Sequence, residues 1–219
     1  MRMILAALLL GGCGSSIKGD VDGDKVKPLS SGFWFAVGSG NNEGIYAVAT
    51  SVPSACKVFT EVYDAQADAY RDFAKDFDVD TLVDDMEAAE QDNLPEEYWA
   101  TSVALDADPD DDEDVEGEYD VEDDEVFINV IHQRGYTDYE KVYVDQDSDG
   151  YQTDSFYADE GVLDVKSFKD EGSLSGSSEL ALRDTDDKNA GDVTLNLSVS
   201  YCEDAEDAYA GYLEVLAGF

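Results

Sequence analysis

The sequence predicts a mainly β fold, α+β by content: an antiparallel β-sandwich or barrel-like sheet with a helical insertion after the second strand. Three observations lead to this prediction. Short segments rich in aromatic and β-branched residues recur along the chain between Gly, Asn and Asp residues, as in folds of many short strands. Several of these segments alternate apolar and polar residues, which is typical of antiparallel sheets with one wet face. One stretch, residues 62–93, instead repeats apolar residues at helical spacing.

The first two strands are expected at residues 32–39 and 44–52, joined as a hairpin by a short Gly/Asn loop. In the insertion that follows, apolar residues three and four positions apart predict an amphipathic helix. Asp80 or Thr81 suits the N-cap of a second, shorter helix, which Pro95 ends. The apolar faces of both helices are expected to pack against the sheet.

The remaining strands are expected at residues 98–107, 125–135, 140–145, 161–170, 175–184 and 192–202. The last alternates most regularly, with the odd positions from Val193 to Tyr201 apolar and the even positions polar. Residues 106–125 carry 14 carboxylates, so we expect a disordered, solvated loop there. The final segment, residues 209–219, fits either a strand or a helix.

Acidic residues dominate the composition: 53 Asp and Glu face 13 Lys and Arg, giving a net charge of −40. This excludes nucleic acid as a partner, because phosphate binding needs a basic surface. It also argues against an anionic lipid surface being recognised by the folded domain. Two compatible explanations remain open, adaptation to high salt (a halophilic surface) and binding of divalent cations.

The amino terminus has the plan of a secretory signal, with Arg2, a short apolar run at residues 4–10 and small residues before Cys13. The apolar run is too short to span a bilayer. Leu10-Gly11-Gly12-Cys13 resembles the lipobox of bacterial lipoproteins. The resemblance implies cleavage after residue 12, a diacylglyceryl thioether on Cys13, and a firm membrane anchor. The alternative is an ordinary signal with a chance cysteine.

If the motif is a lipobox, residues 1–12 are a signal peptide. The small, polar and charged residues that follow predict a flexible tether (13–30), and the rest of the chain a single β-rich domain (31–219). The lipobox also places the protein in the cell envelope. In a Gram-negative host, Gly14 rather than aspartate after the cysteine favours the outer membrane over the inner one, by resemblance to known sorting behaviour. Export also places the two remaining cysteines, Cys56 and Cys202, where disulfides persist, so we expect them to pair. Two buried free thiols are the alternative.

One motif suggests chemistry. Residues 145–151 have the pattern D-x-D-x-D-G-x, in which alternate carboxylates can converge on Ca²⁺ while the glycine allows a sharp turn. It resembles the loops of EF-hands, dockerins and thrombospondin type 3 repeats. The resemblance implies as ligands Asp145, Asp147, Asp149, the carbonyl of Tyr151, and Asp154. Phe156 replaces the bidentate glutamate of an EF-hand, so weak binding is expected, about 0.1–1 mM. The alternative is an ordinary acidic hairpin loop.

No catalytic motif is found in the sequence. His132 follows Val126, Ile128 and Val130 at the same parity of a predicted strand, which suits a structural histidine. The leading hypothesis is therefore a lipid-anchored, non-catalytic domain, steadied by calcium, that binds a protein, glycan or small ligand or serves as a structural component. The alternative is a carboxylate-dependent hydrolase acting on cell-wall or extracellular polymer.

Overall fold

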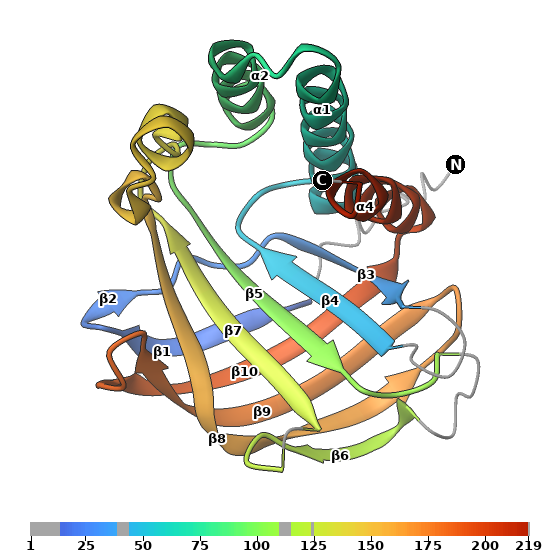
Figure 1. Cartoon of the computed structure of the whole chain (residues 1–219). Helices are drawn as coiled ribbons and strands as arrows, with labels where there is room; N and C mark the ends of the chain where they lie inside the picture. Colours follow the sequence, from blue (N-terminus) through green and yellow to red (C-terminus); the bar gives the residue numbers. More distant parts are fainter. Residues whose placement is uncertain (1–13, 39–43, 110–114, 124, 219) are drawn as a thin grey trace, which may run out of the picture.

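The computed structural model describes residues 14–38, 44–109, 115–123 and 125–218 (Figure 1). The elements in chain order are β1 (Ser16–Val21), β2 (Asp24–Lys25), β3 (Ser31–Val37), β4 (Gly44–Thr50), α1 (Ala55–Asp76), α2 (Val79–Gln91), β5 (Tyr98–Leu105), β6 (Gly117–Asp120), β7 (Val126–Gln133), η2 (Lys141–Asp145), η3 (Ser148–Gly150), β8 (Thr153–Phe168), β9 (Ser173–Asp184), β10 (Asn189–Tyr201) and α4 (Glu203–Leu216). The predicted fold class is confirmed: the protein is mainly β, and α1 and α2 follow the hairpin β3–β4.

The strands form one large sheet that returns on itself. Antiparallel pairs connect β3 to β4, β4 to β5, β5 to β7, β7 to β8, β8 to β9 and β9 to β10. A short parallel contact of Ser200 with Phe33 and Tyr201 with Trp34 then joins β10 back to β3. Strands β1 and β2 extend the sheet beside β10, and β6 pairs with β8. Apart from the contact of β10 with β3, the pairing is antiparallel throughout.

Long strands pass from one layer of this sheet to the other. The first part of β8 pairs with β7 and its second part with β6, while β9 pairs along most of its length. The register shifts between Ala158 and Glu160, just before Gly161. Gly161 has φ +136°, and a Cβ there would lie 2.4 Å from the carbonyl oxygen of Glu179. Only glycine fits this close approach of backbones, which lets β8 bend between the layers.

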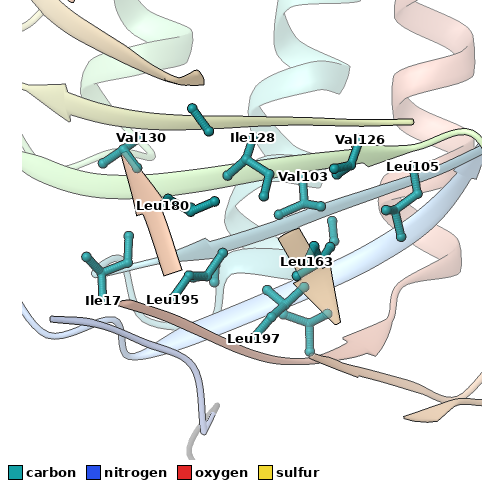
Figure 2. Close-up of a cluster of buried hydrophobic side chains, with 14 of the residues drawn as sticks. Ile17, Val103, Leu105, Val126, Ile128, Val130, Leu163, Leu180, Leu195 and Leu197 are labelled. Carbon is teal, nitrogen blue, oxygen red and sulfur yellow. The ribbon is translucent and has the colours of Figure 1, made fainter. Parts of the chain in front are cut away.

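The main core fills the space between β1, β10, β9 and β8 on one side and β4, β5 and β7 on the other (Figure 2). It consists of every second residue of each strand, because successive side chains of a strand point to opposite faces of the sheet. Leu163 of β8, Leu195 of β10, Val103 of β5 and Ile128 of β7 are all completely buried. The alternation in the sequence therefore identifies the inner face correctly.

A second apolar layer lies between the hairpin β3–β4 and the helices α1 and α4, which cover its outer face (Figure 1). Phe33 and Phe35 are buried in this layer, whereas Trp34 between them points into the main core. A strand covered on both faces needs no polar side, which explains the continuous apolar runs of this hairpin. Among the described residues, no helix is long and apolar enough to cross a membrane.

The predicted tether at residues 13–30 is wrong for the part that the structure describes. Strand β1 pairs with β10 from Ser16 to Gly19, and the side chains of Ile17, Val21 and Leu29 are buried. A few apolar residues in a mostly polar segment suffice, because β10 offers unpaired backbone groups to an added strand.

The strand predicted at residues 140–145 is also wrong: Lys141–Asp145 forms one turn of π-helix. The Asp138 carboxylate accepts the N–H of Lys141, and its carbonyl accepts the N–H of Val142. Tyr139 and Tyr143 stack with ring centroids 5.9 Å apart. Their spacing of four residues suits a helical turn, and it outweighs the alternation of Val142 and Val144.

The acidic segment 106–125 is not disordered throughout, since it contains β6, with Val115 and Tyr119 buried. Its residues 110–114 and 124 lie outside the described residues. The helical insertion begins at Ala55, seven residues before the predicted start. The ambiguous carboxyl terminus is helical as α4, whose first turn carries Glu203, Asp204 and Glu206, a charge arrangement that the helix dipole favours.

Candidate functional site

The cysteine pair is joined as the sequence predicts. Cys56 near the start of α1 and Cys202 just before α4 form a disulfide, with their Cα atoms 6.0 Å apart. The Sγ of Cys202 also accepts the N–H of Ala205 at 3.3 Å and so caps α4. The bridge lies in the apolar layer beside Phe33 and Phe35. It therefore fixes both covering helices at their amino-terminal ends. Cys13 lies outside the described residues.

The predicted calcium loop lies at the surface between η2 and η3. Asp145 ends η2, and Gln146 follows with a left-handed φ of 55°. The Asp147 carboxylate accepts the N–H of Asp149 at 3.0 Å and caps η3. Tyr151 is exposed, with 53% of its surface accessible. The aspartates of the motif are thus exposed to solvent on one compact turn.

Asp154, the last predicted ligand, is engaged elsewhere. It lies in β8 opposite His132 and forms an ion pair with Arg134. Arg134 also bonds Asp24 of β2 at 3.1 Å. Within the part of the chain that the structure describes, no three His, Cys, Asp or Glu side chains are arranged to hold a metal ion. The structure thus places Asp147 and Asp149 close together, but it pairs Asp154 with the guanidinium group of Arg134.

His132 lies at the end of the core near β2. Its ring is buried and stacks on Trp99, with centroids 4.0 Å apart. Its Nε2 lies 3.3 Å from Glu97, which also pairs with Lys27 at 2.9 Å. Hydrogen bonds from Lys27 and then from His132 lower the pKa of the Glu97 carboxyl. Lys27 follows β2 and Glu97 precedes β5, so their ion pair connects the two loops.

An acidic pocket of about 260 Å³ opens where β3, β10, α4 and the turn between β8 and β9 meet. Three carboxylates, Asp170, Glu171 and Glu206, line it together with Trp34 and Tyr201. The Glu206 Oε2 accepts the N–H of Ala36 at 3.1 Å and the hydroxyl of Tyr201 at 3.0 Å. Burial, followed by this bond to Glu206, raises the pKa of the Tyr201 hydroxyl. Two hydrogen-bond donors, the N–H of Ala36 and the hydroxyl of Tyr201, thus hold the Glu206 carboxylate in place.

Sequence reasoning did not find this pocket. Its residues come from five separate parts of the chain, including Pro109 after β5, and share no spacing, and Glu206 is one of many acidic residues in the chain. No signal in the sequence distinguishes Glu206 from the others. No protein-family model, curated protein or solved structure matches the chain, so the site stands on its geometry alone.

Proposed function

We propose that this chain is a lipid-anchored protein of the cell envelope whose β-rich domain is a non-catalytic binding or structural module. The lipobox at residues 10–13 carries this proposal. Two features of the folded domain support it. The disulfide between Cys56 and Cys202 suits an exported protein. Ser15, two residues after Cys13, is already hydrogen-bonded to Ser198, so the domain begins directly after the acylated cysteine.

Replacement of Cys13 tests the anchor. In a Gram-negative expression host, the wild-type chain is expected in the membrane fraction, resistant to salt washes and released by detergent. Cys13→Ser is expected to lose this retention, because the signal's apolar run is too short to anchor by itself. Density separation of the two membranes then tests the predicted outer-membrane location.

The matched control is Cys56→Ser/Cys202→Ser, which removes the other two cysteines and keeps Cys13. This variant should stay in the membrane fraction. Equal retention of the wild-type and Cys13→Ser chains in the membrane fraction would contradict the proposed lipid anchor. A wild-type protein found in the soluble fraction would contradict it as well.

We also propose that the turn around Asp147 and Asp149 binds calcium weakly and steadies η2 and η3. The D-x-D-x-D-G pattern and the exposure of both carboxylates support this. The ion pair of Asp154 with Arg134 means that a full ligand set requires other oxygens, which favours the weak end of the range, about 1 mM. Calorimetric titration of residues 14–219 should give saturable binding that Asp147→Ala/Asp149→Ala abolishes.

The control for calcium binding is Asp184→Ala/Asp186→Ala. These aspartates lie in the acidic turn between β9 and β10, where Asp184 accepts the N–H groups of Asp186 and Lys188. This variant loses the same charge without touching the motif, so it should bind calcium like the wild type. Equal weakening in both double variants would attribute binding to net charge rather than to a site.

The pocket around Glu206 favours the alternative function, a carboxylate-dependent hydrolase of cell-wall or extracellular polymer. The Glu206 carboxylate lies in a concave site with Trp34 and Tyr201, and two further carboxylates, Glu171 and Asp170, line the same site. Glycoside hydrolysis requires a pair of such acidic groups. Release of reducing sugar from peptidoglycan by the wild type, lost in Glu206→Gln, would establish this function in place of the non-catalytic one.

A further inference from the structure

The outer face of β9 and β10 contains a patch without carboxylates. Six outward side chains face one another in three registered pairs, Ser200 with Ser173, Ser198 with Ser175, and Asn196 with Ser177. The residues that alternate with them, such as Leu174 and Val199, are buried in the core. We name these six residues the serine face.

The serine face differs from the rest of the same sheet surface. Farther along the same outer surface, outward positions are Glu160, Glu179 and Asp192, which line an open hollow. The border of the serine face carries both signs of charge. Lys18 of β1 is exposed opposite Thr194, the next outward residue of β10 before Asn196, and Lys169 donates its backbone N–H to the carbonyl of Ser173. Asp164 of β8 lies opposite Ser177 and forms an ion pair with Lys166. In a chain of net charge −40, the six residues of the serine face form a local neutral region.

The amino-terminal chain enters the fold at this face. The Ser15 hydroxyl donates to the carbonyl of Ser198 at 3.0 Å and accepts the N–H of Ser198 at 2.8 Å. Two residues of extended chain span at most about 7 Å. An acyl group on Cys13 is therefore attached close to Ser198, in the middle row of the serine face.

We propose that the serine face lies on the head groups of the membrane, so that the anchored domain has one fixed orientation. This inference rests on the proposed lipid anchor. The net charge argues against contact of the whole domain with anionic lipid, but the charge is unevenly distributed. Near the anchor, the six residues of the serine face bring no carboxylate to the phosphates, and their polar side chains can hydrogen-bond to them. The carboxylate at the border, Asp164, is already paired with Lys166. The acidic surfaces then point toward water.

The test measures the accessibility of single cysteines in the full acylated chain. Ser175→Cys lies in the serine face, and Gln91→Cys is exposed at the end of α2, on the far side of the molecule from β9 (Figure 1). Each protein is added to preformed vesicles of phosphatidylethanolamine and phosphatidylglycerol and reacted with a membrane-impermeant maleimide. The same variants with Cys13→Ser, mixed with the same vesicles, give the rate for the free domain.

Anchoring is expected to slow labelling of Ser175→Cys on the order of ten-fold and to leave Gln91→Cys unchanged. Ser173→Cys is a second probe of the same face and should respond like Ser175→Cys. Equal labelling of anchored and free Ser175→Cys, in a protein that floats with the vesicles, would overturn the orientation and leave the anchor intact. Failure of the acylated chain to float would overturn the anchor and the orientation together.

Discussion

Cys56→Ser/Cys202→Ser in residues 14–219 is expected to lower the free energy of unfolding by up to about 5 kcal/mol. The two cysteines are 146 residues apart in the sequence, so the bridge closes a loop that contains most of the sheet. Without the disulfide, the unfolded chain gains conformational entropy, and the folded state loses the covalent link between α1 and the residue that precedes α4. The Sγ of Cys202 also caps α4, and a serine hydroxyl can accept the same N–H. The loss is therefore expected to come from the cross-link rather than from the cap.

Urea unfolding followed by tryptophan fluorescence measures this effect, because Trp34 and Trp99 are both buried. The wild type should show the same loss when it is unfolded in the presence of a reductant, and the double variant should not respond to the reductant. Similar midpoints for the oxidised wild type and the double variant would contradict a stabilising role for the bridge.

Leu163→Ala is expected to destabilise the protein by about 2–5 kcal/mol. Leu163 is completely buried and belongs to the cluster of Figure 2 with Val103 and Leu197. It lies in β8 where this strand pairs with both β6 and β9, opposite Tyr119 and Ser178. Because residues from both layers surround the side chain, the cavity left by alanine cannot close by a small movement of one strand.

Val162→Ala is the matched control for this substitution. Val162 is the neighbouring residue of the same strand, but it faces outward and 41% of its surface is accessible. Its truncation should cost less than about 1 kcal/mol, the range of strand preference at an exposed site. Thermal or urea unfolding of both variants gives the comparison, and similar losses in the two would contradict the assignment of the inner face.

The predictions that concern local patterns agree best with the structure. The alternation at residues 192–202 identifies the inward positions of β10, and the apolar repeat after residue 62 identifies the helical insertion. The pairing of Cys56 with Cys202 is predicted from the cysteine count together with the expected export, and the structure contains this disulfide. The predictions failed where the same local pattern allows two structures. Residues 140–145 alternate like a strand, but the stacking of Tyr139 on Tyr143 and the cap by Asp138 make them helical.

The candidate sites show the same division. The aspartate motif can be recognised because its members are neighbours in the sequence, and the structure places Asp147 and Asp149 on one turn. It could not be foreseen that Arg134 would hold Asp154, because that ion pair depends on the register of β7 with β8. The pocket around Glu206 and the serine face likewise depend on which strands and helices become neighbours.

The sequence by itself determined the fold class, the helical insertion, the paired cysteines and the excess of negative charge. Hydrophobic period and composition act within a few residues, so they can be read without knowing what lies across the sheet. Only the tertiary structure decided that residues 16–21 are a strand rather than a tether, since their partner, β10, is more than 170 residues away in the chain. It also decided where carboxylates are absent, because the distribution of charge over a surface is set by strand register and not by composition.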